Sequence, residues 1–460
     1  MDKLTMDFNY ENCMKEGLKN LAITSTVKIK SEEKYFKEVM QQDDTGVKIL
    51  KKLSGNDLPT FYIPQVTEEV NIFKAQLRAE ARGRFFEREL SRLLTSEELK
   101  YMWTLLQEHH TPLNNFIHNQ YINYKSFIQV KQKLSDKYKS FFNPSIFLQL
   151  QDSKIKGFLS IDTFFNYIMK KIWIDQTRNG LSQYDSSGCG YLSEADFEAY
   201  ILDLIPTLTQ LKKLEKMFYS FYSCMVVRKF FFYLDPLRTG KIRIIDILSC
   251  GFLDELLELR EENWSKESQK KNWFSVPSAL HIYSSYLELD KDHNGLLSRQ
   301  EITGYKSGAL TSVFLDRVFQ DAFTYNGEMD YKGYLNFVLA TENRHEPQSL
   351  RYLFRFLDIK NQGYLDSFTI NYFSRAVADR LPKEQQQMVS MEDIKDEIFD
   401  MIKPEDPSKI TLKDIIRSKM GHIIVNILVD FNGFWSYEFR ETLATNSISD
   451  NNFNESFVTN

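Results

Sequence analysis

Apolar residues recur at helical spacing through most of this chain, and short polar loops interrupt them. In residues 68–94 they fall three or four positions apart, with charged residues on the other face. Residues 95–98 read Thr-Ser-Glu-Glu, a capping box, so a second helix is expected to begin near Ser96. From about residue 141 the helical stretches come in pairs around a loop with glycine at its sixth position and an apolar residue at its eighth. The pattern predicts an all-α fold: an elongated array of helix–loop–helix pairs with short loop-pairing strands.

Five loops carry this repeat, and they begin at Asp152, Asp185, Asp235, Asp290 and Asp358. Two half-loops, at residues 326–331 and 407–412, fall where partners for the Asp290 and Asp358 loops are needed. Such loops work in pairs, because their short strands bond to each other and the adjoining helices bury their apolar faces together. We therefore expect three or more paired units, with Ile410 in the strand of the last one.

The stretch 290–301 reads Asp-Lys-Asp-His-Asn-Gly-Leu-Leu-Ser-Arg-Gln-Glu and satisfies the EF-hand calcium pattern at every fixed position. Ca²⁺ takes about six to eight oxygen ligands at roughly 2.3–2.6 Å, and a tight loop supplies them from alternating positions. The predicted ligands are side-chain oxygens of Asp290, Asp292 and Asn294, the carbonyl of Leu296, Ser298 directly or through water, and both carboxylate oxygens of Glu301. The alternative is a solvated acidic turn. Three carboxylates favour a calcium site with an affinity of about 10⁻⁷–10⁻⁵ M.

The other loops keep the glycine but have poorer ligands. The replacements are Lys154, Lys156 and Thr163 in the first loop, Ser187, Cys189 and the short Asp196 in the second, Leu237 and Arg243 in the third, and Lys360 and Thr369 in the last. We expect these loops to preserve the fold without holding calcium. The sequence leaves open whether the Asp185 and Asp358 loops bind metal.

The composition is that of a chain with several domains and sizeable cores. Of 460 residues, 42% are hydrophobic and 26% are charged, and the net charge of −5 does not favour a nucleic-acid surface. No apolar run approaches the roughly 18–20 residues of a membrane span, and the N-terminus lacks a secretory signal pattern. The four cysteines form no CxxC pair, which favours a reducing compartment. We expect a soluble intracellular protein without nucleic-acid or membrane partners.

Common catalytic motifs are missing from the sequence. It contains no GxxxxGK[ST], GxGxxG, HExxH or GxSxG stretch, and its seven histidines are spread out. Its paired carboxylates belong to the loops or to mixed-charge helices. We therefore expect a protein that acts by binding and is not an enzyme.

Two long segments are idiosyncratic: residues 220–242, which include Arg-Lys-Phe-Phe-Phe-Tyr-Leu-Asp-Pro, and residues 273–280, Trp-Phe-Ser-Val-Pro-Ser-Ala-Leu. Shorter ones lie at residues 58–62, 166–173 and 430–435. All five resemble the B″ regulatory subunits of protein phosphatase 2A, most closely the gamma branch with the plant TONNEAU/FASS type. The resemblance spans about residues 56–440.

This resemblance implies a non-catalytic adaptor that docks on the phosphatase scaffold subunit, next to the catalytic subunit. Such an adaptor selects phosphoserine and phosphothreonine substrates and places the enzyme in the cytoplasm, at centrosomes, basal bodies or microtubule arrays, with the nucleus as a further location. The calcium ligands carry over onto the six residues named above, and the catalytic metals belong to the partner subunit. The alternative is a structural microtubule-organising, ciliary or centriolar EF-hand protein that does not engage the phosphatase.

The expected organisation has six segments. They are a flexible N-terminal segment (1–55), a helical domain (56–140), a degenerate EF-hand-like region (141–260), an EF-hand pair with the intact calcium loop (261–345), a degenerate C-terminal pair (346–444) and a disordered tail (445–460). Substrates, scaffold-contacting residues, oligomeric state and the role of calcium as switch or brace do not follow from these patterns.

Overall fold

The computed structural model describes residues 68–111, 120–151, 155–212, 214–261, 265–322, 324–382 and 390–440. The predicted N-terminal segment 1–55, the stretch 58–62, the start of the first loop at Asp152 and the tail 445–460 lie outside the described residues. The chain divides into two compact units, Met1–Tyr191 and Leu192–Asn460, and each is described by itself.

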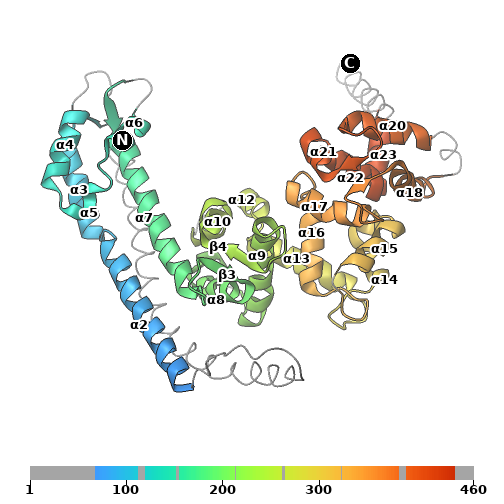
Figure 1. Cartoon of the computed structure of the whole chain (residues 1–460), viewed down its shortest axis with the longest axis horizontal. Coiled ribbons are helices and arrows are strands. Elements are labelled where there is room, and N and C mark those ends of the chain that lie inside the picture. Colours follow the sequence, from blue (N-terminus) through green and yellow to red (C-terminus); the bar gives the residue numbers. More distant parts are fainter. Residues whose placement is uncertain are drawn as a thin grey trace, which may run out of the picture. The chain divides into compact units, whose positions relative to one another are not determined.

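The first unit is helical, with one pair of short strands (Figure 1). Its elements are α2 (Glu68–Arg92), α3 (Ser96–Glu108), β1 (Tyr121–Asn123), α4 (Tyr124–Lys133), α5 (Asp136–Lys139), α6 (Pro144–Leu150), β2 (Phe158–Ser160) and α7 (Ile161–Tyr184). The predicted capping box is present, since Thr95 and Glu98 bond to each other's backbone at the start of α3. In the core, the ring of Phe127 lies 4.8 Å from that of Phe142 and 5.2 Å from that of Phe164, between centroids.

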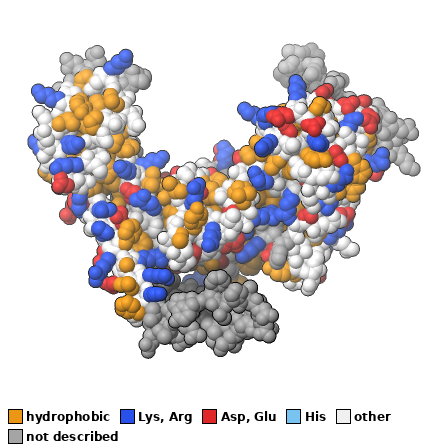
Figure 2. Space-filling model, in the orientation of Figure 1, with side chains coloured by type: hydrophobic (Ala, Val, Ile, Leu, Met, Phe, Trp, Pro, Cys, Tyr) orange, Lys and Arg blue, Asp and Glu red, His pale blue; other side chains and the backbone are white. Residues whose placement is uncertain are grey.

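The apolar stripe of α2 is exposed over much of its length. Phe73, Leu77 and Phe85 keep 64%, 58% and 50% of their surface exposed. Figure 2 shows apolar and basic side chains exposed together along this helix. Helical periodicity predicted the helix correctly, but it does not reveal whether another element covers the stripe.

The second unit repeats the helix–loop–helix theme. Its strands are β3 (Tyr191–Ser193), β4 (Lys241–Arg243), β5 (Tyr364–Leu365) and β6 (Ile410–Thr411). Its α-helices are α8 (Glu194–Leu204), α9 (Tyr219–Leu234), α10 (Ile244–Ser249), α11 (Phe252–Leu257), α12 (Lys266–Lys271), α13 (Val276–Leu289), α14 (Arg299–Ile302), α15 (Ser312–Asp321), α16 (Tyr331–Glu342), α17 (Pro347–Leu357), α18 (Ser367–Ala378), α20 (Met391–Ile402), α21 (Leu412–Ser418), α22 (Gly421–Val429) and α23 (Phe431–Glu438). Short 3₁₀ turns lie at Ile205–Thr207, Thr209–Leu211, Lys216–Phe218, Glu258–Arg260 and Tyr305–Gly308.

The loops pair as the sequence predicts. The described residues contain the antiparallel pairs β1–β2 and β5–β6, the sheet of β3 with β4, and a two-residue bridge between Leu297 and Met329. The half-loop 326–331 is therefore the partner of the Asp290 loop, and Ile410 lies opposite Leu365. The all-α prediction with short loop-pairing strands is confirmed.

One expectation needs correction, because the repeats begin before residue 141. Ile122 in β1 lies opposite Leu159 in β2, and both side chains are fully buried. The partner of the first loop is thus the segment before α4. The sequence did not predict this pairing, because the segment has no glycine-bearing loop pattern of its own.

Four of the five loops share one backbone geometry whether or not they keep metal ligands. Their fourth and sixth residues have positive φ: Gly188 and Gly190 (68° and 79°), Arg238 and Gly240 (57° and 74°), His293 and Gly295 (57° and 79°), and Asn361 and Gly363 (51° and 78°). A positive φ at the sixth position costs least for glycine, which explains why this residue recurs there.

Across the described part of the chain, no helix has both the length and the apolar character that crossing a membrane requires.

Candidate metal site

The Asp290 loop lies between two helices that position its acidic residues. Helix α13 ends at Leu289, so Asp290 stands at its C-terminus. Glu301 lies in the first turn of α14, where Ser298 and Glu301 form a capping box. Leu297 and Met329 exchange two backbone hydrogen bonds of 2.8 Å, and both side chains are fully buried. The buried bridge holds the loop against its partner and fixes where the helices leave it.

Three predicted ligands converge. Asp290, Asp292 and Glu301 each offer a carboxylate oxygen, and these atoms lie within 4.8 Å of one another. Among the described residues this is the one group of three or more His, Cys, Asp or Glu side chains that could hold a metal ion. Asp290 is 2% exposed and Glu301 9% exposed, whereas Asp292 faces solvent. The cluster combines two buried carboxylates with one open to the solution from which an ion would enter.

Backbone N–H groups hold the carboxylate of Glu301 across the loop. Its Oε1 accepts from the N–H of Lys291 at 2.8 Å and from that of Asp292 at 3.4 Å. Its Oε2 accepts from both the N–H and the hydroxyl of Ser298 at 2.8 Å. Burial alone raises the pKa of Glu301, but these hydrogen bonds outweigh it and hold the pKa below its usual range. Glu301 is thereby kept ionised, as a metal ligand must be.

The remaining polar residues of the loop bond to one another. Asp290 accepts from the N–H groups of Asn294 and Gly295 at 3.2 and 3.0 Å. Asp292 accepts from the backbone and the side-chain amide of Asn294 at 3.1 and 3.0 Å. The Asn294 side-chain oxygen accepts from the N–H of Leu296 at 2.7 Å. The structure thus brings Asp290, Asp292 and Glu301 together and places Asn294, Leu296 and Ser298 in the same hydrogen-bonded loop.

Carboxylate, amide and carbonyl oxygens are the hard donors that Ca²⁺ prefers, and a loop of this spacing suits its large coordination number. A softer ion such as Zn²⁺ would favour Cys and His, and the loop contains only His293, at a non-ligand position. The residues therefore fit calcium.

The Asp235 loop keeps the backbone hydrogen bonds of its first residue but has an arginine among its candidate ligand positions. Asp235 accepts from the N–H groups of Thr239 and Gly240 at 2.9 and 2.7 Å. At its twelfth position the same loop has Asp246, which forms an ion pair with Arg243 at 2.8 Å. A cation thus occupies the neighbourhood where a bound metal would need free carboxylate oxygens.

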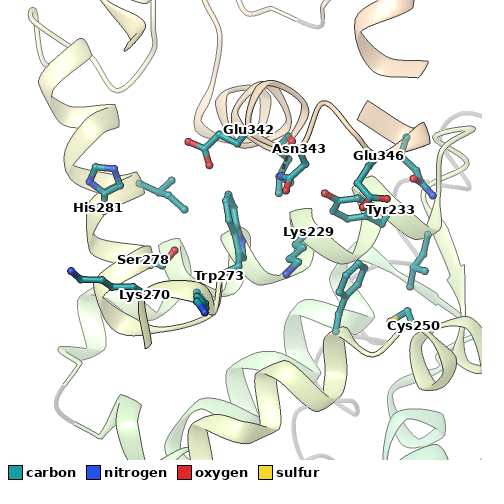
Figure 3. Close-up of a pocket in the computed structure, with 16 residues that line it drawn as sticks. Lys229, Tyr233, Cys250, Lys270, Trp273, Ser278, His281, Glu342, Asn343 and Glu346 are labelled. Carbon is teal, nitrogen blue, oxygen red and sulfur yellow. Dashed lines mark hydrogen bonds between the residues drawn. The ribbon is translucent and has the colours of Figure 1, made fainter. Parts of the chain in front are cut away.

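A hollow of about 660 Å³ lies elsewhere in the second unit, lined by residues of α9, α12, α13 and α16. Figure 3 shows Trp273 and Lys229 facing it, with Glu342 and Asn343 entering from α16. Lys229 forms an ion pair with Glu255 at 2.9 Å. Sequence reasoning did not anticipate this hollow, because its lining comes from helices far apart in the chain.

Comparison with known proteins places the chain in a family. No family model matches the chain. The human B″ gamma regulatory subunit of protein phosphatase 2A is 54% identical over 389 residues, which cover 85% of each chain. The B″ gamma protein of Xenopus tropicalis is 54% identical over 396 residues, covering 86% of this chain and 88% of the relative. The chain belongs to the B″ family of protein phosphatase 2A regulatory subunits.

A more distant B″ protein and one solved chain are also similar. The probable B″ protein TON2 of Arabidopsis thaliana is 35% identical over 408 residues, 85% of this chain and 84% of that protein. A solved chain from a PP2A PR70 holoenzyme is 27% identical, with a TM-score of 0.49, and covers 56% of this chain and 96% of its own. The resemblance to the B″ family expected from the idiosyncratic segments is confirmed.

Proposed function

We propose that this B″ chain is a non-catalytic regulatory subunit of protein phosphatase 2A. It docks on the scaffold subunit, next to the catalytic subunit, and selects phosphoserine and phosphothreonine proteins for dephosphorylation. The observation that carries the proposal is the 54% identity to B″ gamma regulatory subunits over 85% of the chain. The catalytic metals belong to the partner subunit, and the chain contributes binding surfaces.

The same proposal makes the Asp290 loop a calcium site. Its ligands are Asp290, Asp292, Asn294, the Leu296 carbonyl, Ser298 and Glu301. The support is the convergence of three carboxylates within 4.8 Å, in a loop whose strand is bridged to Met329. Bound calcium would tie the end of α13 to the start of α14, and so set the angle at which these helices meet their neighbours.

The proposal is tested by mixing the purified full chain with purified scaffold and catalytic subunits. Size-exclusion chromatography in calcium and in chelator then follows the assembly. We expect a complex of the three proteins in calcium and a weaker one in chelator. Elution of the chain apart from the phosphatase in both conditions would contradict the proposal. In a pull-down from cells, recovery of tubulin-associated or centriolar proteins without the phosphatase subunits would favour the structural alternative.

Within the cell, the proposal places the complex in the cytoplasm at centrosomes, basal bodies or microtubules. The proposal keeps residues 261–345 as the calcium-binding pair, and it moves the start of the first paired unit back to β1, before residue 141. Imaging the tagged chain, with and without depletion of the scaffold subunit, tests the location. Loss of the localised signal on scaffold depletion is the expected result.

A further inference from the structure

A second hollow in the Leu192–Asn460 unit, of about 890 Å³, is rich in arginine. It lies against the Asp235 loop and helix α17, and four guanidinium side chains line it: Arg228 of α9, Arg238 of the loop, and Arg351 and Arg355 of α17. The rest of the lining includes the apolar side chains of Phe231, Phe232, Leu237, Tyr352 and Phe354. We refer to this hollow as the arginine pocket.

The acidic residues of the arginine pocket are already engaged. Glu194 pairs with Arg228 and also with Lys332 at 3.6 Å. Asp358 accepts from the N–H groups of Gln362 and Gly363 at 3.0 and 2.6 Å. Asp235, as described above, accepts from the backbone of its own loop. Asp235 and Asp358 are the first residues of their loops, and their carboxylates accept hydrogen bonds from the loop backbone. Glu194 is the acid that forms an ion pair with an arginine of the pocket.

Glu194 neutralises Arg228 in part, and Arg355 donates to the backbone carbonyl of Asp321, which carries no charge. The buried Nε of Arg228 has no hydrogen-bond partner within the described ranges. Arg238 lies with its guanidinium carbon 5.4 Å from the centre of the Tyr352 ring. Partial burial, and next the positive charge of Arg355, lower the pKa of Arg238. The positively charged arginines of the pocket repel one another, and an anion bound among them would reduce this repulsion.

Arg238 reaches the arginine pocket because of its place in a loop that has lost its metal ligands. It stands at the fourth position with φ of 57°, the same left-handed geometry as His293 in the calcium loop and Asn361 in the Asp358 loop. Left-handed backbone is costly for a residue other than glycine, asparagine or aspartate. The contact with Tyr352 and the pocket offsets part of that cost.

We propose that the arginine pocket binds an acidic segment of a partner protein, taking one Asp or Glu carboxylate beside an apolar residue. Arginine forks bind carboxylates through paired charge-assisted hydrogen bonds, and the aromatic floor suits the apolar neighbour. Among the described lining residues there are four guanidinium groups and three carboxylates, an excess of one positive charge. One carboxylate matches this excess better than a phosphate dianion does. If this chain is a phosphatase regulatory subunit, as proposed above, the partner is a substrate of the phosphatase; this step rests on the proposed function.

The test uses the full chain alone, so it is independent of phosphatase assembly. Binding of three fluorescent decapeptide libraries is compared by anisotropy. The libraries differ in their central residue, which is Glu, Gln or phosphoserine. Within each library, two positions around the centre are randomised among Leu, Ile and Val. We expect the Glu library to bind best and its affinity to fall as salt rises. Equal binding of the Glu and Gln libraries would overturn the proposal, and tighter binding of the phosphoserine library would overturn the carboxylate assignment.

Variants locate the binding. Arg238→Asn removes the charge while keeping a side chain that tolerates left-handed backbone, as Asn361 does. Arg351→Gln removes a second charge from an exposed position on α17. Each is expected to weaken binding of the Glu library by about tenfold. The matched control Arg375→Gln, an exposed arginine of α18 outside the pocket, should leave binding unchanged. Equal losses in all three variants, with unchanged melting temperatures, would place the binding elsewhere.

Discussion

The ammonium nitrogen of Lys360 lies 2.8 Å from the carboxylate of Asp366. These are the third and ninth residues of the Asp358 loop, positions that face a bound ion in a calcium loop. A protein cation therefore stands at the position that Asp292, a proposed ligand, has in the Asp290 loop. Because of this ion pair, we expect the Asp358 loop of this B″ chain to keep its backbone geometry without binding calcium.

Restoring the ligands should restore the site. The double substitution Lys360→Asp with Thr369→Glu gives the Asp358 loop acidic residues at positions one, three, nine and twelve. Isothermal titration calorimetry is expected to show one additional bound calcium per chain, because the backbone already has the left-handed fourth and sixth residues. Thr369→Glu alone, which leaves Lys360 in place, should add no site. An unchanged number of calcium ions per chain in the double variant would show that restoring the acidic residues is not sufficient for this loop to bind calcium.

The Lys360–Asp366 pair should also affect acid stability. Burial raises the pKa of Asp366, but bonds from Lys360 and Thr369 outweigh it and lower the pKa to about 2. Because the folded-state pKa is below the unfolded value, the stabilisation is present above about pH 4 and is lost as the pH falls toward 2. Asp366→Asn, which keeps the helix cap, should cost about 1–2 kcal/mol at pH 7.

Guanidinium unfolding of the wild type and Asp366→Asn, followed by circular dichroism at several pH values, measures this difference. The gap between the two proteins should stay constant from pH 7 to about 5 and narrow below pH 4. A gap that widens on acidification would contradict the assigned ion pair.

A buried ion pair joins the last two helix–loop–helix pairs. Arg344 and Asp430 lie 3.0 Å apart, with side chains 9% and 13% exposed, and Asp430 also caps α23. Asp430→Ala leaves the Arg344 charge buried without a carboxylate and should cost about 3–5 kcal/mol of unfolding free energy. Glu405→Gln breaks the exposed pair with Arg417 and should cost at most about 1 kcal/mol. Similar losses in both variants, measured by guanidinium unfolding, would be inconsistent with this difference in burial.

Trp273 should report on calcium. It lines the hollow of Figure 3 together with Ser278 and His281 of α13, the helix that ends at Leu289, directly before Asp290. Tightening of the loop around an ion is expected to shift α13 and change the fluorescence of the indole. The change should largely vanish in Trp273→Phe and persist in Trp435→Phe. A signal that survives Trp273→Phe unaltered would show that the hollow does not sense the loop.

Local pattern was enough to predict the glycine-bearing loops and the partners of two of them. Glycine at the sixth position and an apolar residue at the eighth identified the strands of Leu297 and Leu365. The half-loops 326–331 and 407–412 were assigned by their place in the chain, and they supply the partners Met329 and Ile410. Ligand spacing likewise identified the three carboxylates that the fold brings together. The loop pattern and the set of carboxylates within 290–301 depend on residues close in sequence, where the spacing itself fixes the geometry.

Features that depend on distant residues were not predictable in the same way. Strand β1 lacks a loop motif, so its pairing with β2 became visible only in the fold. The arginine pocket gathers side chains from α9, the Asp235 loop and α17, and no spacing in the sequence brings Arg228 near Arg355. The exposed stripe of α2 has the periodicity of a buried face, because periodicity records amphipathic character and not the element that covers it.

Calorimetric titration of calcium into the purified full chain tests the central claim most directly, with Glu301→Gln beside the wild type. Asp196→Asn, at the equivalent twelfth position of the Asp185 loop, serves as the matched control. We predict one ion per chain with a dissociation constant of about 10⁻⁷–10⁻⁵ M, at least about tenfold weaker binding in Glu301→Gln, and no change in Asp196→Asn. Unchanged affinity in Glu301→Gln would contradict the assignment of calcium to residues 290–301.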